Sequence, residues 1–413
     1  MNHMWADMRS EAPKAGDSTS AGAYRAGDEG RMDPASRRWT MGDYIAQAPE
    51  VARANIDRCD ELLAPLLACC PQGVPERIRL VASGSSFNAC QCMMPFMRSC
   101  LPQTPIRLVT PHRFMYYEAE VAPGELVMVV TQSGMSTNAL AALDVLRARG
   151  ERSICLCGNV DADARNHADV LIDWGVGEEL VGYVTKGVTT LALFLGLLAC
   201  RLGNCAQRMA DLARAVEVSD AVRRSAASFF ERHEKELTSM SVCYCVAPWI
   251  AQGVACEGAL KIGETVHIPS AAYEVEEFIH GPNLQLTPAY TLLFFDAGDA
   301  ASARTRQIWR AAREVSDRAF LITCEDAGLG AASGNATASP AELLALRDDP
   351  RVLVAPRVPD PALASLAYLP FVQTLSYRAS AALGSAKQHP LLRRFKACVS
   401  AKSEGFVNYD GDE

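Results

Sequence analysis

The chain has 413 residues, of which 49% are hydrophobic and 21% charged, so it is long enough for two or three domains with sizeable cores. Its formal net charge of −8 at pH 7 argues against nucleic acid as the main partner, because such proteins need a basic surface to contact phosphates. The most apolar run, residues 190–200, is far shorter than the roughly 20 residues of a membrane-spanning helix and is expected to be a buried helix.

The fifteen cysteines are an odd number scattered through the chain, and no secretory signal is recognisable in the polar N-terminus. We therefore expect reduced thiols in a cytoplasmic protein. Close pairs such as Cys155 with Cys157 and Cys243 with Cys245 lack the spacing of metal ligands and are interpreted as small buried hydrophobes. No sequence feature demands a metal or an organic cofactor.

Taken from the N-terminus, residues 1–37 lack periodicity and are expected to be a disordered tail without chemistry. Residues 40–67 have a helical pattern with an expected break at Pro49. From residue 78 onwards, short apolar strands alternate with helices, which indicates a parallel sheet covered on both faces. The strands of this first half are expected at residues 78–82, 106–109, 126–130, 153–156 and 170–173.

The second half repeats this alternation after two linking helices within residues 205–236. Its strands are expected at residues 242–246, 290–295, 320–323 and 352–354, and a long helix at 361–383. The sequence therefore predicts two α/β domains, at residues 38–222 and 223–386, followed by a polar C-terminal tail at 387–413.

Two strand–turn–helix connections in the first half are rich in small hydroxyl residues. They read VASGSSFNACQ, with Ser85 and Ser86, and VVTQSGMSTNAL, which runs through the loop 131–136. Backbone N–H groups and hydroxyls at a helix N-terminus bind anions, although ordinary helix capping would use the same residues. Two such loops in one domain favour a phosphate-binding site, and neither is a nucleotide-binding sequence of the Walker A or GxGxxG type.

A third loop, residues 180–190 (LVGYVTKGVTT), opens the apolar helix. Thr185 and Lys186 stand at the helix start, where a lysine does not complement the helix dipole. The two open interpretations are a contact with a ligand and a simple solvated lysine.

The stretch EGALKIGETVHIPSAAYEVEEFIHGPNLQL, residues 257–286, carries two groups that could move protons. Glu257, Lys261 and Glu264 share one helix face, and His280 lies in a Gly-Pro turn. An acid, a lysine and a histidine of this kind suit proton transfer next to a carbonyl or an imine. The alternatives are an ordinary helical ion pair and a structural histidine.

Together these motifs resemble the double-SIS (sugar isomerase) family, which includes the isomerase part of glucosamine-6-phosphate synthase and the fructosamine-6-phosphate deglycases. The resemblance extends from about residue 40 to the C-terminus and is most specific in EGALKIGE followed by HGP. It implies an α/β fold of two tandem SIS domains, each a flavodoxin-like three-layer sandwich. It also implies a homodimer or larger homo-oligomer with shared active sites, a sugar-phosphate substrate, and no nucleic acid or membrane partner.

The resemblance further implies roles for individual residues. Glu264 would be the base that moves a proton between C1 and C2 of the open-chain sugar, with Lys261 beside it. His280 would open the ring or shuttle a proton, in the active site of a neighbouring subunit. Lys402, in an Ala-Lys-Ser motif of the C-terminal tail, would close over the sugar. The predicted substrate-binding residues are Ser85, Ser86, Thr131, Gln132, Ser133, Ser136, Val184, Thr185 and Lys186.

The chain also departs from the synthase pattern. Met135 replaces a common acidic residue, Val184 replaces a usual serine, and no glutaminase domain is recognisable, so ammonia from glutamine is not expected. In the second half the connection after Val246 reads Ala-Pro-Trp, so that half is expected to lack a phosphate site and to supply catalytic groups instead.

The sequence leaves three functions open. The first is a deglycase or isomerase acting on a 6-phosphorylated ketosamine or amino sugar. The second is a non-catalytic phosphosugar-binding regulator. The third is an aminotransferase/isomerase of the synthase type that uses free ammonia.

Overall fold

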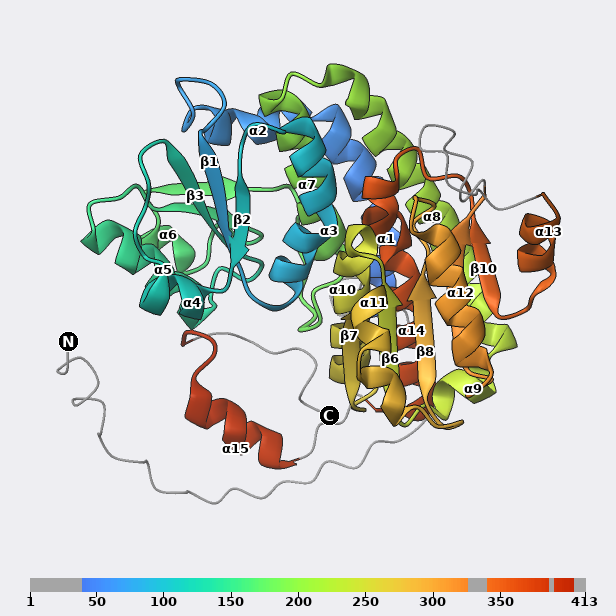
Figure 1. The fold of residues 1–413 in the computed structure, drawn as a ribbon. Helices are drawn as coiled ribbons and strands as arrows, with labels where there is room; N and C mark the ends of the chain where they lie inside the picture. The colour runs from blue at the N-terminus through green and yellow to red at the C-terminus, as the bar shows by residue number, and fades with distance from the viewer. Residues whose placement is uncertain (1–38, 326–339, 386–389, 405–413) are drawn as a thin grey trace, which may run out of the picture. The chain divides into compact units, whose positions relative to one another are not determined.

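The first half of the chain is a five-stranded parallel sheet, as the alternating pattern predicted (Figure 1). The structure is a computed structural model and describes residues 39–325, 340–385 and 390–404, so the expected N-terminal tail lies outside the described residues. The strand order is β2-β1-β3-β4-β5. The strands are β1 (Arg77–Val81), β2 (Ile106–Val109), β3 (Glu125–Thr131), β4 (Ile154–Cys157) and β5 (Val170–Asp173).

The second half forms another five-stranded parallel sheet, in the order β10-β9-β8-β6-β7. Numbered within each half, both sheets have the order 2-1-3-4-5, so the internal duplication seen in the sequence is confirmed in the topology. This is the flavodoxin-like order, and the predicted α/β fold class is confirmed. The strands are β6 (Cys243–Ala247), β7 (Ser270–Glu274), β8 (Thr291–Phe295), β9 (Ala319–Cys324) and β10 (Val352–Ala355).

Helices surround both sheets, because strands that are apolar on both faces must be covered on both. In the first half they are α1 (Met41–Asp57), α2 (Cys59–Leu67), α3 (Gly84–Cys100), α4 (Pro111–Tyr117), α5 (Thr137–Ala148), α6 (Ala164–His167) and α7 (Lys186–Leu202). The linking helices are α8 (Met209–Arg232) and α9 (Glu234–Thr238). In the second half they are α10 (Gln252–Thr265), α11 (Val275–Ile279), α12 (Ser302–Arg313), α13 (Pro340–Asp348), α14 (Ala364–Leu383) and α15 (Pro390–Val399).

The expected helix break at Pro49 is wrong. Pro49 lies within α1, and the break falls at Arg58, whose backbone leaves the helical region at φ −97° and ψ 18°. A proline in a helix removes one hydrogen bond, but Pro49 is buried, and packing of this helix face outweighs the loss. The expected boundary between residues 222 and 223 falls inside the continuous helix α8 and remains a prediction.

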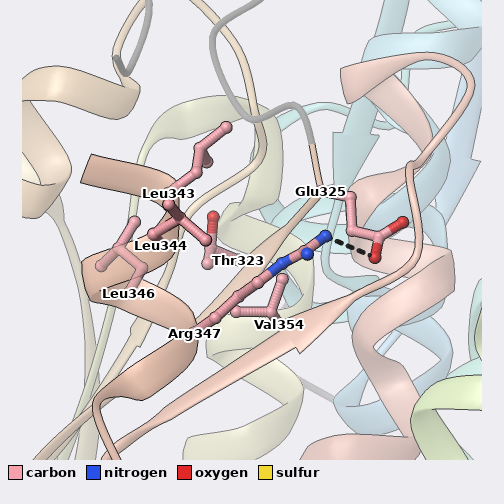
Figure 2. A pocket seen from close by; sticks show the side chains of 7 residues that line it. All are labelled: Thr323, Glu325, Leu343, Leu344, Leu346, Arg347 and Val354. Atoms are coloured by element: carbon pink, nitrogen blue, oxygen red, sulfur yellow. Dashed lines mark hydrogen bonds and ion pairs between the residues drawn. The ribbon is translucent and has the colours of Figure 1, made fainter. Parts of the chain in front are cut away.

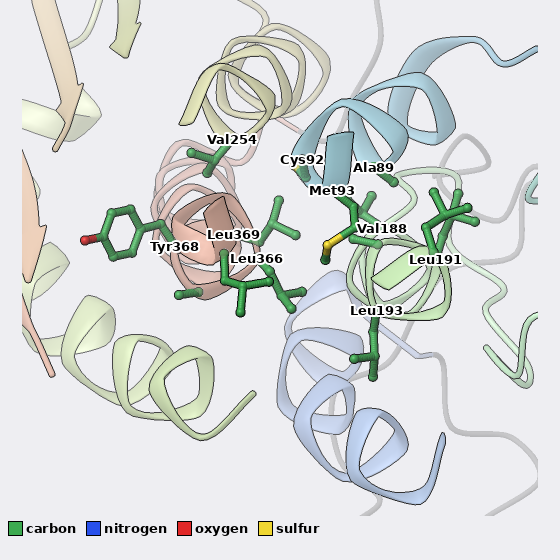
Figure 3. Packing of buried hydrophobic residues seen from close by; sticks show 14 of the residues in the cluster. Ala89, Cys92, Met93, Val188, Leu191, Leu193, Val254, Leu366, Tyr368 and Leu369 are labelled. Atoms are coloured by element: carbon green, nitrogen blue, oxygen red, sulfur yellow. The ribbon is translucent and has the colours of Figure 1, made fainter. Parts of the chain in front are cut away.

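Helices from both halves share one apolar core, which fixes the two sheets relative to each other (Figure 3). In this core Met93 of α3 and Val188 of α7 lie near Leu366 and Leu369 of α14, and Val254 comes from α10. Apart from Arg201, α7 is buried along its whole length, which confirms the expected buried helix. In the described part of the chain, every helix lacks the length or the hydropathy that crossing a bilayer requires.

Candidate active site

The two hydroxyl-rich loops lie side by side at the carboxyl edge of the first sheet. They follow β1 and β3, which are neighbours where the strand order reverses, and this switch point is where sheets of this topology bind ligands. Gly84 has a positive φ of 55°, which lets the chain turn sharply from β1 into α3. The side chain of Asn138 in α5 donates to Ser83 Oγ at 2.9 Å and thereby joins the two loops.

A buried ionic cluster on α10 contacts the first of these loops. Lys261 Nζ donates to Ser85 Oγ at 2.8 Å and to Glu264 Oε2 at 2.8 Å, and lies 3.3 Å from Glu257 Oε1. Glu257 accepts from Ser85 at 3.1 Å and from Asn88 Nδ2 at 2.8 Å. The side chains of Glu257 and Lys261 are 0% and 1% exposed, whereas that of Glu264 is 36% exposed. Within this cluster, Glu264 is thus the carboxylate open to a ligand.

The electrostatics of the cluster follow from one lysine between two carboxylates. Burial raises the pKa of Glu257 above its ordinary value, and Lys261 and Asn88 limit the rise. Burial lowers the pKa of Lys261, but Glu257 and Glu264 outweigh it, so the net pKa of Lys261 is raised. Lys261 therefore carries a charge at neutral pH and holds the Glu264 carboxylate in place beside Ser85.

The second loop is in contact with the C-terminal tail. Lys402 Nζ donates to Ser133 Oγ at 2.8 Å and to Ser136 Oγ at 3.0 Å, and the backbones of residues 136 and 402 form an isolated antiparallel bridge. Burial lowers the pKa of Lys402. The ammonium group of the tail thus lies among the hydroxyls that the sequence predicted to hold a phosphate.

Two residues of the second loop that the sequence predicted to bind substrate have buried polar atoms without a hydrogen-bond partner among the described residues. Thr131 Oγ1 is buried and has no hydrogen-bond partner among the described residues, and the same holds for Gln132 Oε1. Since buried polar groups are normally paired, an unpaired hydroxyl at the carboxyl end of β3 suits contact with a ligand. Ser86 is also buried, in the first turn of α3.

The third loop has a different arrangement from the one that the sequence suggested. The carboxylate of Glu179 accepts from the backbone N–H groups of Thr185, Lys186 and Gly187 at 2.7–2.9 Å and so caps α7. The Lys186 ammonium donates to the carbonyl of Glu178 at 2.7 Å and is only 3% exposed as a residue, so the alternative of a solvated lysine is wrong. Gln132 also donates to Glu179, at 3.1 Å.

Three residues at the site were not on the predicted list. Glu257 accepts from Ser85 and from Asn88, and Glu179 occupies the N-terminus of α7. The spacing of Glu257, Lys261 and Glu264 on one helix face was a usable signal for the first of these. Asn88 meets Glu257 only through the fold, across 169 positions of sequence, whereas Glu179 caps backbone groups six to eight residues further along the chain.

Residues 74–199, which include all five strands of the first sheet, match the SIS domain family. The resemblance to the double-SIS family is confirmed.

Two relatives of this chain are glutamine–fructose-6-phosphate aminotransferases. The protein from Pseudomonas aeruginosa is 29% identical over 217 residues, which are 50% of this chain and 35% of the relative. The protein from Zymomonas mobilis is 23% identical over 324 residues, which are 76% of this chain and 51% of the relative. The chain thus spans between about a third and a half of the length of these relatives.

Solved structures share the double-SIS fold over most of their length. A candidate phosphosugar isomerase from Clostridium difficile has a TM-score of 0.75 at 20% identity, covering 89% of this chain and 99% of its own. The C-terminal domain of the Francisella tularensis glucosamine-fructose-6-phosphate aminotransferase has a TM-score of 0.69 at 18% identity, covering 86% and 99%. Glucosamine-6-phosphate deaminase from Thermotoga maritima has a TM-score of 0.61 at 15% identity, covering 83% and 95%. At these identities the likeness shows the fold.

In the second SIS-like half, the corresponding switch point contains an internal ion pair. Asp296, directly after β8, accepts from Arg306 at 3.1 Å and from Thr323 at 3.0 Å, and all three residues are at most 1% exposed. After β6, Pro248 leads into a short 3-10 helix at Trp249–Ala251. That the second half has no phosphate site of its own stays a prediction.

His280 lies far from Glu264 within one chain. It is exposed and follows α11 at the carboxyl edge of the second sheet, whereas Glu264 ends α10 next to the start of β7, at the amino edge. The five residues of β7 separate these edges by roughly 15 Å. The two side chains therefore do not form a single-chain site in this fold.

A cavity of about 300 Å³ lies elsewhere, at the carboxyl ends of β9 and β10 below α13 (Figure 2). Its wall combines leucines of α13 with an exposed ion pair between Arg347 and Glu325 at 2.8 Å. It contains none of the predicted site residues. We therefore place the candidate active site at the two loops and α10.

Proposed function

We propose that the chain is a deglycase or isomerase that acts on a 6-phosphorylated ketosamine or amino sugar by proton transfer through an enolamine. One observation carries the proposal: the partly exposed Glu264 carboxylate is held by Lys261 directly beside Ser85 of the first anion-binding loop. A carboxylate next to a phosphate-binding loop suits abstraction of a proton alpha to a carbonyl or imine. The relatives named above act, by their names, on hexose 6-phosphates, which fits this substrate class.

In the proposed complex the phosphate lies at the two loops. Backbone N–H groups at the start of α3 and α5 point their dipoles at it, and Ser86, Thr131, Ser133 and Ser136 offer hydroxyls. Lys402 already lies between Ser133 and Ser136 and would become the counter-ion of the phosphate. The sugar would then extend from the phosphate towards α10, with its C1 and C2 carbons near Glu264.

The chemical roles follow from this placement. Glu264 takes the proton from the carbon next to the carbonyl or imine carbon, which gives the enolamine, and then returns the proton to the former carbonyl or imine carbon. Lys261 keeps the carboxylate oriented through its 2.8 Å hydrogen bond. His280 of a second copy would open the sugar ring or shuttle a proton, which requires at least a dimer. A cytoplasmic location is part of the same proposal.

The reaction is tested by product analysis. Candidate 6-phosphorylated ketosamines and glucosamine 6-phosphate are supplied, and glucose 6-phosphate, fructose 6-phosphate and free amine or ammonia are measured by coupled assays. Release of any of these products supports the proposal. Stabilisation by sugar phosphates without turnover would instead identify a binding regulator. Amination of fructose 6-phosphate by free ammonia would identify the synthase-type reaction.

Removing the charge of Lys402 should weaken binding of the sugar phosphate. A charge-assisted hydrogen bond contributes roughly 1.5–3 kcal/mol, so Lys402→Met is expected to raise the Kd by about 10- to 100-fold. Isothermal titration with the preferred sugar phosphate measures the change. Lys396→Met, on α15 in the same tail, is the matched control. An unchanged Kd for Lys402→Met would show that the ammonium does not contact the phosphate.

Mixing two inactive variants tests the shared site. In hybrids of Glu264→Gln with His280→Ala, one of the two sites receives both intact residues if His280 acts across the interface. We therefore expect recovery of up to roughly a quarter of wild-type activity in a statistical mixture of dimers. Refolding or co-expression of the two variants, followed by the product assay, measures it. Activity that stays at the level of the separate variants would argue against exchange of His280 between subunits.

A further inference from the structure

A cluster of three cysteines lies at the end of the first domain opposite to the candidate active site. Cys100 ends α3, Cys200 is in the last turn of α7, and Cys205 follows in the loop towards α8. Since α3 starts at the site loop and has 17 residues, the cluster is about 25 Å from Ser85. Its chemistry is therefore separate from substrate binding.

The backbone brings the three residues into contact. The N–H group of Cys205 donates to the carbonyl of Cys200 at 2.8 Å, and the Cys205 thiol lies 3.8 Å from the carbonyl oxygen of Cys100. Gly203 passes so close to Cys100 that a Cβ on this glycine would lie 2.2 Å from the Cys100 carbonyl oxygen. The main chain thus places the Cys205 thiol directly beside Cys100.

One of the three thiols, that of Cys100, has a lowered pKa and ionises more readily than an ordinary cysteine. Arg208 Nη1 donates to Cys100 Sγ at 3.6 Å, and the same guanidinium lies 4.1 Å from the centre of the Phe96 ring. The hydrogen bond from Cys200, and then the charge of Arg208, lower the pKa of Cys100 to about 6. The pKa of Cys200 is raised by its hydrogen bond to Cys100, and burial raises that of Cys205. Cys100 is thus the thiol of the cluster that ionises most readily and can attack an oxidised neighbour.

The three thiols differ in their exposure to solvent. Cys100 and Cys200 are 3% and 2% exposed, whereas Cys205 is only partly buried. A small oxidant therefore reaches Cys205 first. Sulfenic acid formed on the accessible Cys205 would thus have a resolving thiol next to it.

We propose that Cys205 and Cys100 are a thiol-oxidation site that forms an intramolecular disulfide on exposure to a hydroperoxide. In the first step Cys205 loses its proton to solvent, its thiolate attacks hydrogen peroxide and the O–O bond breaks, and the hydroxide that leaves takes up a proton, so that sulfenic acid and water form. In the second, the Cys100 thiolate attacks the Cys205 sulfur, the S–S bond forms, and the hydroxide that leaves takes up a proton to give a second water. Two thiols lose two electrons in total, and the peroxide gains them.

The disulfide would alter a contact between the two halves of the chain. Arg208 also pairs with Asp360, whose side chain caps the turn before α14 by accepting from Ala362 N at 2.8 Å. Oxidation removes the Cys100 thiolate from this guanidinium and ties α3 covalently to the loop between α7 and α8. The oxidised protein therefore differs from the reduced one where the first domain meets the start of α14.

Non-reducing peptide mapping tests the proposal on the full-length reduced protein. Trypsin separates the three cysteines into different peptides, with Cys100 in residues 99–107, Cys200 in 187–201 and Cys205 in 202–208. After brief treatment with hydrogen peroxide and alkylation of the remaining thiols, we expect peptide 99–107 disulfide-linked to peptide 202–208. The linked pair should disappear in Cys205→Ser and on reduction with dithiothreitol.

A second measurement follows the reactivity of Cys100 directly. Its rate of alkylation by iodoacetamide should rise with pH through a midpoint near the pKa of about 6, and Arg208→Gln should move that midpoint upward. Cys398, exposed on α15, is the internal control for peroxide and alkylation. The proposal is overturned if Cys100 and Cys205 stay alkylatable while Cys398 is oxidised, or if Cys200 is the main partner of either residue.

Discussion

Replacing Glu264 by glutamine is expected to lower kcat by about 10²- to 10⁴-fold, the range that a positioned general base contributes. The amide keeps the size of the carboxylate and can still accept the hydrogen bond from Lys261, but it cannot take a proton. Binding of the sugar phosphate should persist, since the loops at residues 83–86 and 131–136 are untouched. Catalysis and binding are therefore separable at this position.

Product release at saturating substrate measures kcat, and isothermal titration with the same sugar phosphate measures binding. Glu234→Gln, an exposed glutamate at the start of α9, makes the same chemical change away from the site and should leave both unchanged. If Glu264→Gln turned over substrate at the wild-type rate, the general base would have to be another residue. Loss of binding together with activity would indicate a role in holding the sugar.

The sequence could predict the part of the site that depends on local pattern. Hydroxyl-rich turns after two apolar strands, with helices behind them, specify loops at the carboxyl edge of a parallel sheet, and the structure brings both loops to the switch point between β1 and β3. The helical spacing of Lys261 and Glu264 likewise predicted a contact that the structure contains, at 2.8 Å. In these places secondary structure alone determines which side chains meet.

Contacts between distant segments could not be read in the same way. Glu257 meets Ser85 across 172 positions of sequence, and Lys402 meets Ser133 across 269, so neither pair has a periodic signature. Lys186 could have faced solvent or a ligand, and only the packed fold shows it turned to the carbonyl of Glu178. The polar composition of the C-terminal tail also concealed α15, whose exposed apolar side chains include Leu391 and Phe395. Such features depend on tertiary packing, which outweighs local preference.

Lys261→Met should be the most destabilising single change at the site. It leaves Glu257, which is fully buried, without the cation that compensates its charge, and loss of one partner of a buried ion pair typically costs about 3–5 kcal/mol. Methionine fills a similar volume, so little of the cost comes from a cavity. Urea denaturation measures the free energy of unfolding, with Lys235→Met on α9 as an exposed-lysine control. Adding Glu257→Gln should recover much of the loss, because the unpaired charge is then gone.

The pH dependence of the free energy of unfolding of Lys261→Met identifies the cause of its destabilisation. Burial raises the folded-state pKa of Glu257 above its unfolded value, so between the two pKa values the native state binds more protons and the free energy of unfolding falls as pH rises. Lys261 limits this shift. Without the lysine, the folded-state pKa of Glu257 rises further, and the pH range over which the free energy of unfolding falls becomes wider. The free energy of unfolding of Lys261→Met should therefore lie further below that of the wild type near pH 8 than near pH 5. A deficit independent of pH would mean that packing of the lysine stem, not compensation of the Glu257 charge, stabilises this helix face.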